Sequence, residues 1–455
     1  MSEKQSTLFC YGGTGSVTGA NFVLDTGETR IMVDCGLEQG TPEADAKRTL
    51  FRYDPFTIDT LIVTHAHMDH IGRIPLLVQK GFKGQIYSTP ATKELAALMF
   101  DDALAIMAME QESSGTVPLY SREDVGRTLL LWQARKYHQI FMLGRDDIGI
   151  RFFDAGHVMG SAMVECTRGG RTIVFTGDLG NSPSPLLRDT EALPTAHYLV
   201  IESVYGDRLH DGLSERREKF REIVEEVRHL RGVLLIPAFS LERTQVLLYE
   251  LKQLVEKEGM APIDVYLDSP LATRISSVYR AHEGEMNERA QKEGEKGDVL
   301  TFPGINVIGG GKDSAAIKDT ANPKIIIAGS GMSHGGRIQS HEKQFLGEKN
   351  TIILFVGYQA VGTLGRRIQE GQKKIRVDDT WVRVRARALT LHGYSAHADR
   401  DQLLRVVESG AHSLERVFVA MGEPHSAMFL AQRIHDFLGI DAIAPKESDS
   451  FKINW

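Results

Sequence analysis

One stretch restricts the possible folds of this chain more than any other. It is a short apolar run that is followed directly by a cluster of side chains of metal-ligand type. Residues 60–63 are Thr-Leu-Ile-Val, and residues 64–70 have the sequence THAHMDH. A short run rich in β-branched residues predicts a buried strand, and open α/β sheets carry their sites at the carboxyl ends of strands. The four candidate ligands are His65, His67, Asp69 and His70. Burying four such groups without a partner would be costly, so the stretch predicts a site for a metal such as zinc, which accepts nitrogen and oxygen ligands together.

Length and composition restrict the class of protein. A chain of 455 residues exceeds one ordinary core, which predicts two domains and three at most. The hydrophobic share of 42% and charged share of 25% are typical of a soluble globular protein. We expect no membrane partner, because no apolar stretch reaches the ~18 residues that span a bilayer, and the start of the chain has no signal segment.

Cysteine count and charge add two further expectations. Three widely spaced cysteines argue against a disulfide framework and favour a reducing, cytoplasmic location. The net charge of -7 argues against non-specific nucleic-acid binding through bulk charge. A local basic groove stays compatible with this composition.

The first part of the chain predicts a sheet with an antiparallel start. Residues 8–11, 21–25 and 30–36 have the pattern of three strands, the first two joined by a Gly-rich turn. Asp34 ends the third strand, where it either orients a ligand histidine or simply forms a turn. Residues 91–112 are predicted to be a helix whose methionines pack in the core.

Four later strands are each predicted to end in a polar residue of ligand type. The strands lie near residues 150–157, 171–178, 198–206 and 416–425. Their polar residues are His157, Asp178, Glu202 and His425. Each is weak evidence alone, because a turn aspartate or a buried histidine is common. Their recurrence at strand ends favours one shared site.

The middle of the chain alternates helix and strand patterns from about residue 208, which predicts a doubly wound α/β domain. A Gly-rich turn at 329–337 follows one of its strands and could hold a phosphodiester, although a plain tight turn is about as compatible. The residues of this turn that we expect to bind substrate are Ser330, Gly331, Ser333, Gly335, Gly336 and Arg337. Residues 381–389 alternate apolar and basic side chains, which predicts one half-exposed strand with a basic face.

Taken in order, these residues resemble the metallo-β-lactamase fold. His65, His67, Asp69, His70, His157, Asp178 and His425 match its metal-ligand pattern, and Glu202, His397 and His425 resemble the further motifs of its β-CASP branch, which includes RNA nucleases. The resemblance covers almost the whole chain. It implies an α/β fold in which an αββα sandwich, residues 1–207 and 381–455, is interrupted by a doubly wound β-CASP domain at 208–380.

The resemblance also implies a mechanism. His65, His67 and His157 would hold one Zn²⁺, Asp69, His70 and His425 a second, and Asp178 would bridge the two. Two ions ~3.5–4 Å apart would share a hydroxide and clamp a phosphodiester for attack. Asp69 would orient that hydroxide, His397 would act as the general acid and Glu202 would fix its tautomer. Mn²⁺ or Fe²⁺ could replace zinc at such ligands.

The expected activity is hydrolysis of single-stranded RNA in RNA processing or decay. We favour endonuclease action, with 5′-exonuclease action as the alternative, and a homodimer is left open. RNA is expected to bind in a localised groove between the domains. Two other functions compete: a small-molecule ester or thioester hydrolase on the same scaffold, and a non-catalytic RNA-binding scaffold. The inserted domain and the pair Glu202 and His397 argue against the first, and the full ligand set argues against the second.

Overall fold

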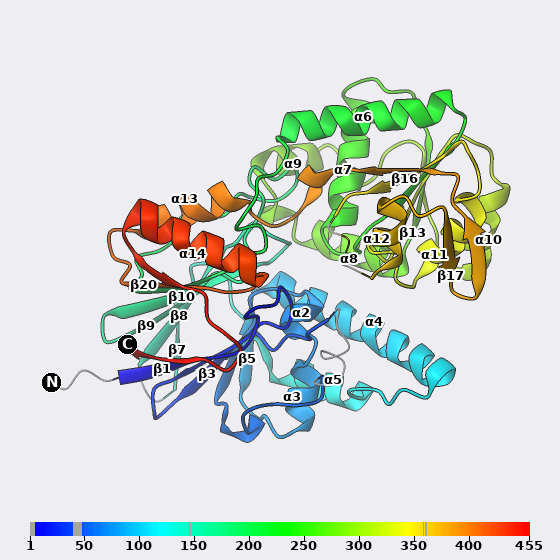
Figure 1. Cartoon of the computed structure of the whole chain (residues 1–455). Helices are drawn as coiled ribbons and strands as arrows, with labels where there is room; N and C mark the ends of the chain where they lie inside the picture. Colours follow the sequence, from blue (N-terminus) through cyan, green and yellow to red (C-terminus); the bar gives the residue numbers. More distant parts are fainter. Residues whose placement is uncertain (1–4, 40–47, 145–146, 358, 360–361) are drawn as a thin grey trace. The chain divides into compact units, whose positions relative to one another are not determined.

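The chain folds into two compact units. The computed structural model describes residues 5–39, 48–144, 147–357, 359 and 362–455. The first unit contains residues 1–209 and 397–455, and the second contains residues 210–396 (Figure 1). The second unit is therefore an insertion in the first.

The first unit contains two seven-stranded sheets, and the first sheet begins the chain. Its strands β1, β2 and β3 pair antiparallel, whereas β3, β4, β5 and β6 pair parallel, which confirms the predicted antiparallel start. The strands, in sheet order, are β22 (Ser450–Asn454), β1 (Gln5–Gly12), β2 (Asn21–Asp25), β3 (Arg30–Val33), β4 (Thr60–Ile62), β5 (Gln85–Ser88) and β6 (Trp132–Ala134).

The second sheet packs against the first through their apolar faces. One core cluster joins Leu8 and Leu24 of the first sheet to Ile150, Phe175 and Val200 of the second. The strands β8, β10, β11 and β20 share one direction, so their carboxyl ends meet at one edge. The strands, in sheet order, are β21 (Asp441–Ile443), β20 (Arg416–Val419), β11 (Tyr198–Ile201), β10 (Arg171–Phe175), β9 (Ala162–Arg168), β8 (Ile148–Asp154) and β7 (Phe141–Leu143).

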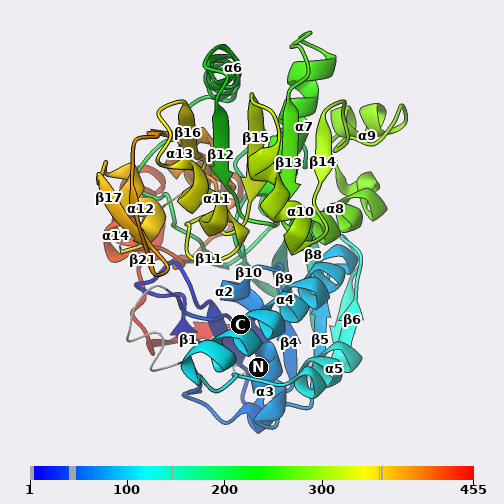
Figure 2. The same ribbon diagram turned by 90° about the vertical axis from the view of Figure 1, so that its right-hand side faces the viewer.

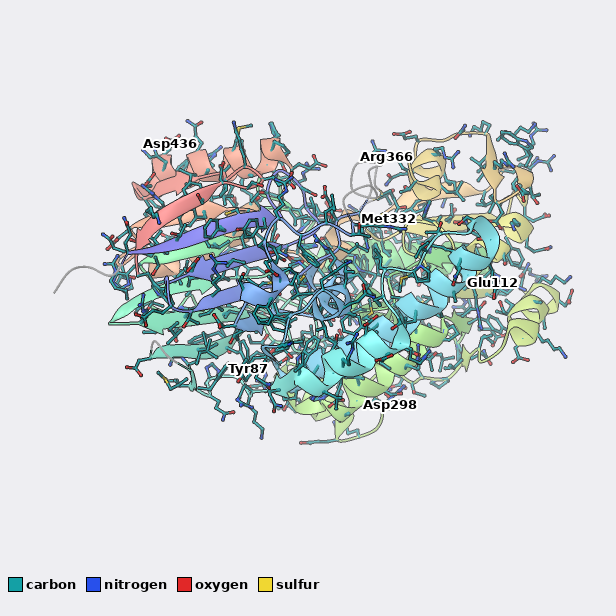
Figure 3. All side chains as sticks on the ribbon, turned by 90° about the horizontal axis from the view of Figure 1, so that it is seen from below. Tyr87, Glu112, Asp298, Met332, Arg366 and Asp436 are labelled. Carbon is teal, nitrogen blue, oxygen red and sulfur yellow. The ribbon has the colours of Figure 1, made fainter. Side chains whose placement is uncertain are left out.

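Helices cover the outer faces of this sandwich. The first sheet is covered by α2 (Met68–Ile71), α3 (Ile74–Gln79), α4 (Pro90–Ser114) and α5 (Arg122–Leu131), and the second by α13 (Arg400–Gly410) and α14 (Pro424–Leu438). Figure 3 shows α4, where Glu112 is labelled, and α14, where Asp436 is labelled, on opposite sides of the unit. The 3-10 turn η1 spans Pro55–Thr57.

The distal part of α4 corrects one prediction. The sequence placed the methionines of this helix in the core, but the Met109 side chain is 69% exposed and Ile106 is 50% exposed. The buried residues of α4 all lie in its first half, the last of them being Phe100. The second half therefore exposes Ile106 and Met109, whereas Met107 contacts Leu119, whose amide nitrogen lies 3.4 Å from its sulfur.

The second unit is built on a six-stranded sheet whose pairs are all parallel. Figure 2 shows its strands side by side, with β17 and α12 at one edge and α9 at the other. The strands, in sheet order, are β14 (Ile305–Val307), β13 (Asp264–Asp268), β15 (Lys324–Ala328), β12 (Val233–Pro237), β16 (Thr351–Phe355) and β19 (Arg387–Thr390). This order confirms the predicted doubly wound α/β arrangement.

Helices and short turns connect these strands. The helices are α6 (Leu213–His229), α7 (Arg243–Glu256), α8 (Pro270–Ala281), α9 (Glu288–Gly294), α10 (Gly311–Ala316), α11 (Arg337–Phe345) and α12 (Leu364–Gln369), and the 3-10 turns are η2 (Glu283–Glu285), η3 (Ile317–Asp319) and η4 (His392–Tyr394). Within the described ranges, no helix of either unit combines the length and the apolar character needed to cross a membrane.

The segment before the return to the first unit differs from the prediction. Residues 381–389 do not form one strand: β18 (Thr380–Arg383) pairs with β17 (Lys374–Val377), whereas β19 joins the large sheet beside β16. The chain breaks between them because the amides of Arg385 and Ala386 both donate to the carbonyl of Leu346. The strand β19 belongs to the second unit, which spans residues 210–396, and the first compact unit resumes at His397. The domain boundary at residue 381 stays a prediction.

Candidate metal centre

Four candidate ligands come from the connection between β4 and α2. His65 and His67 lie in the extended segment after β4, and His67 is the N-cap residue of α2. Asp69 and His70 lie within the short helix itself. The strand is fully buried between β3 and β5, which fixes the start of this segment inside the unit.

Two further candidates lie just beyond strands of the second sheet. His157 lies three residues after the end of β8 and Asp178 three residues after the end of β10. Each follows a glycine with positive φ, Gly156 at +66° and Gly177 at +54°. A Cβ on Gly177 would lie 2.6 Å from Cβ of Thr64, so only glycine lets this turn approach the histidine-bearing segment.

The ring nitrogens and a carboxylate converge on one point. Nδ1 of His67 lies 3.1 Å from Nε2 of His65 and 3.2 Å from Nε2 of His157. Oδ2 of Asp178 lies 3.5 Å from Nε2 of both His65 and His157. Three imidazole nitrogens and one carboxylate oxygen all within 4.8 Å of one another form a donor set that fits a zinc-type cation.

His70 extends this group toward a second position. Its Nδ1 lies 2.7 Å from Oδ2 of Asp34, and its Nε2 lies 3.3 Å from Oδ1 of Asp178. The Nε2 atom is buried and has no hydrogen-bond partner within the described chain. A buried nitrogen oriented by a carboxylate on its far side is the arrangement of a metal-binding histidine. A role in forming a turn therefore does not by itself account for Asp34, whose carboxylate contacts His70.

Thr64 is a supporting residue that the sequence analysis missed. Its hydroxyl lies 2.8 Å from Oδ2 of Asp34 and 3.1 Å from Nδ1 of His65, and its amide donates to Oδ1 of Asp34 at 2.8 Å. It therefore ties Asp34 to the ligand segment. Its position directly before His65 was the available sign, but threonine at a strand end is too common to single out.

The electrostatics of the group centre on Asp178. Burial alone would raise the pKa of Asp178, but His70 and His65 outweigh it and hold this pKa well below its usual range. Burial, together with the neighbouring His70, lowers the pKa of His65 well below its usual range. Burial raises the pKa of Asp69, which interacts electrostatically with His70, Asp178 and His397. Asp178 is thus ionised beside a neutral His65, the protonation states in which these two residues bind a metal. Burial would lower the pKa of His70, but Asp178 and Asp34 outweigh it and raise this pKa well above its usual value.

Beside this group lies the predicted acid pair. Nδ1 of His397 lies 3.3 Å from Oε1 of Glu202 and 3.8 Å from Oδ2 of Asp178. Glu202 follows β11 directly and is fully buried, and its Oε1 also accepts the amide N–H of Leu179 at 2.6 Å. Burial lowers the pKa of His397, but Glu202 and Asp178 outweigh it and raise the pKa to about 9. The structure thus places His397 and Glu202 beside the candidate metal ligands.

Comparisons with known proteins identify the family. Family profiles match the chain at three places: the metallo-beta-lactamase superfamily at residues 17–238, the Beta-Casp domain at 244–368 and the Zn-dependent metallo-hydrolase RNA specificity domain at 381–445. Ribonuclease TTHA0252 of Thermus thermophilus is 36% identical over 91% of this chain and 94% of its own length. This chain belongs to the β-CASP branch of the metallo-β-lactamase superfamily.

Other relatives of this β-CASP protein support the assignment. Transcription termination factor FttA of Pyrococcus abyssi is 30% identical, and the match spans 97% of this chain and 70% of the relative. A crystal structure of a protein of unknown function from Enterococcus faecalis covers 99% of this chain with a TM-score of 0.58 at 12% identity, a likeness of fold alone. The predicted family and fold class are confirmed.

His425 is not brought to the metal centre. The sequence predicted a strand ending at this residue, but β20 ends at Val419 and His425 is the second residue of α14. Its side chain is 78% exposed, and its Nδ1 lies 3.3 Å from Oδ2 of Asp207. The strand assignment was wrong because the chain turns into the helix first, and the first turn of α14 directs His425 toward solvent.

The Gly-rich turn at 329–337 uses two of its predicted phosphate ligands for its own structure. Ser333 is fully buried and its hydroxyl donates to the carboxylate of Glu342. The guanidinium of Arg337 lies 2.6 Å from Oδ1 of the buried Asp268. Substrate contact by the other residues of this turn stays a prediction; they are Ser330, Gly331, Gly335 and Gly336.

Proposed function

We propose that this β-CASP protein is a metal-dependent ribonuclease that hydrolyses phosphodiester bonds of single-stranded RNA. One observation carries the proposal: a buried histidine held by a carboxylate, His397 with Glu202, lies next to a convergent set of metal ligands. The alkoxide that leaves an RNA phosphodiester is a poor leaving group and needs a proton, whereas the thiolate of a thioester leaves without one. The printed names of the relatives, a ribonuclease and a transcription termination factor, favour RNA as the substrate.

The donor set indicates which residues would hold metal. We assign His65, His67, His157 and Asp178 to one ion, and His70, Asp69 and Asp178 to a second. Zinc is favoured by the nitrogen-rich ligands and by the Zn-dependent RNA specificity domain that matches residues 381–445, while Mn²⁺ or Fe²⁺ would accept the same ligands. When bound, such ions polarise a phosphodiester and lower the pKa of water toward ~7.

The chain's own residues would move the proton. Glu202 Oε1 faces Nδ1 of His397 and keeps a proton on that nitrogen, and it favours the imidazolium, whose second proton, on Nε2, is the transferable one. His397 would donate that proton to the leaving oxygen of the RNA. Glu202 is itself held by the amides of Leu179 and Val204, so the imidazole cannot turn away. Asp69 would orient the attacking water.

The test compares cleavage of 5′-labelled and internally labelled single-stranded RNA by the wild type and three variants. His397→Ala and Asp178→Ala should abolish metal-dependent cleavage. His435→Ala, which removes a histidine that is 71% exposed, should cleave like the wild type. Metal content, measured by mass spectrometry, should fall in Asp178→Ala and stay unchanged in His397→Ala.

The products decide further parts of the proposal. Internal fragments would support the endonuclease action that we favour, and mononucleotides released from the 5′ end would support exonuclease action. Cleavage of esters or thioesters without any cleavage of RNA would refute the proposal and favour a small-molecule hydrolase.

We place the activity in the cytoplasm, because the three cysteines are all buried and unpaired, as in a reducing compartment.

A further inference from the structure

The hairpin formed by β17 and β18 has an apolar inner face and a basic outer face. Its inner residues, Ile375, Val377 and Val382, are buried in the core of the second unit. The outer residues of the hairpin are Lys374, Arg376, Trp381 and Arg383. In the strand register Lys374 lies opposite Arg383, and Arg376 lies opposite Trp381.

Two positive charges of this outer face lie opposite one another. Like charges directly opposite one another destabilise a strand pair, so Lys374 and Arg383 oppose the hairpin on which they lie. Among the described residues, neither these two nor the neighbouring Lys373 and Arg385 has an acidic partner, although the chain has a net charge of -7. Arg376, in contrast, is paired with Asp379 at 2.7 Å. Four cations without an acidic partner in the described chain, gathered at one hairpin of an acidic protein, favour an anionic ligand.

Trp381 adds an aromatic surface between these cations. Its side chain is 61% exposed, whereas the other two tryptophans of the chain, Trp132 and Trp455, are 1% and 3% exposed. Nζ of Lys374 lies 4.9 Å from the centre of the Trp381 ring. An exposed indole beside cations matches the two needs of single-stranded nucleic-acid binding: a plane on which a base stacks, and positive charge for the backbone.

We propose that the outer face of the β17–β18 hairpin binds single-stranded RNA, with a base stacked on Trp381 and phosphates at Lys374 and Arg383. The inference rests on the proposed ribonuclease function, which supplies the substrate class. Single strands are preferred to duplexes, because a base must be unstacked from its neighbours to lie on the indole. An acidic protein surface is the competing partner, and the experiment separates the two.

The first measurement is intrinsic fluorescence, since Trp381 is the exposed tryptophan of the chain. Titration with single-stranded oligouridine, in a His397→Ala background that keeps the metal ligands, should quench its emission. Trp381→Ala should weaken RNA binding about tenfold, as expected for loss of one stacked base. Trp381→Phe should recover part of that loss.

The second measurement is the salt dependence of affinity, followed by anisotropy of labelled RNA. The double variant Lys374→Gln, Arg383→Gln should lower the slope of log affinity against log salt by about 1.4, the loss of two phosphate contacts to a single strand. The matched control is Lys257→Gln, Lys296→Gln, which removes the same charge from two exposed lysines elsewhere in the unit that have no acidic partner among the described residues. The control should keep the slope.

Hydrolysis of the small diester bis(p-nitrophenyl) phosphate, measured with His397 present, separates the two proposals. The inference is supported when the hairpin variants lose RNA affinity and keep wild-type activity on this diester. Unchanged RNA affinity and no quenching would overturn the inference, leave the ribonuclease proposal intact and favour an acidic protein partner. A wild type that binds RNA through Trp381 but cleaves none would instead refute the ribonuclease proposal alone.

Discussion

Replacing Glu242 by glutamine should stabilise the protein, and more so at pH 8 than at pH 5. Glu242 directly precedes α7 and has φ +65° and ψ -57°. The amide of Arg243 donates to the carbonyl of Leu241 at 2.9 Å, so these three residues form a strained γ-turn with Glu242 at its centre. The carboxyl is only 5% exposed and accepts the hydroxyl of Tyr279. Burial raises its pKa from 4.5 to about 7, although Tyr279 and Arg243 act in the opposite direction.

The sign and the size follow from this shift in pKa. The folded state favours the neutral carboxyl, so ionisation begins to destabilise the fold as pH rises above 4.5, and the penalty stops growing above about 7. At about 1.4 kcal/mol per pH unit, the penalty is about 1 kcal/mol at pH 5 and about 3 kcal/mol at pH 8. Glutamine keeps the shape and an acceptor for Tyr279 but cannot ionise. Its gain over the wild type should therefore grow by roughly 2 kcal/mol between the two pH values.

The assay is urea unfolding of wild type and Glu242→Gln, followed by circular dichroism at both pH values. Comparing each variant with the wild type at the same pH cancels every other titrating group, including the metal ligands. The control is Glu288→Gln, since that carboxylate is 90% exposed and should change stability equally at both pH values. An equal effect of Glu242→Gln at pH 5 and pH 8 would show that the buried carboxyl ionises normally and refute the reasoning.

Four further outcomes are expected at the metal centre. Glu202→Gln should slow single-turnover RNA cleavage by about 10²-fold or more, the worth of a general acid, without loss of metal; unchanged cleavage would exclude its role beside His397. Asp34→Asn should weaken metal binding about 10–100-fold in a chelator competition, because His70 loses its orienting carboxylate; wild-type affinity would contradict this. Gly36→Ala should lower the melting temperature and the metal content together, because its Cβ would lie 1.6 Å from the carbonyl oxygen of Asp69; a normal protein would mean that the segment adapts. Chelation of bound metal should lower the melting temperature, and added zinc should restore it. The metal should contribute about 4 kcal/mol to the free energy of unfolding when its concentration is 1,000 times Kd. An unchanged melting temperature would argue against bound metal in the folded state.

The local parts of the site were predictable because they depend on neighbours in sequence. A buried strand followed by THAHMDH specifies both a strand end and a set of ligand types, and the structure places all four candidates after β4. The parallel strands of the second unit were equally visible, since each is a continuous apolar run buried on both faces. A pattern of this kind needs no long-range contact to be recognised.

Convergence of distant residues was decided by the tertiary structure. His157 and Asp178 reach the centre because Gly156 and Gly177 turn the chain at positive φ directly before them. His425 does not, because β20 ends at Val419 and the helix α14 has already begun. Successive residues of a helix differ in direction by ~100°, so a boundary error of a few residues decides whether a side chain faces the site or solvent.

The sequence by itself therefore determined the ligand chemistry, the family and the alternation of elements, whereas the tertiary structure decided which polar side chains are available. Arg337 had the composition of a phosphate ligand, yet the buried Asp268 holds its guanidinium. Residues 381–389 had the pattern of one basic strand, yet they divide between a hairpin and the large sheet, which leaves Trp381 and its cations on an outer face. The physical reason is that a charge or an aromatic ring acquires its role from its partners, and those partners are distant in sequence.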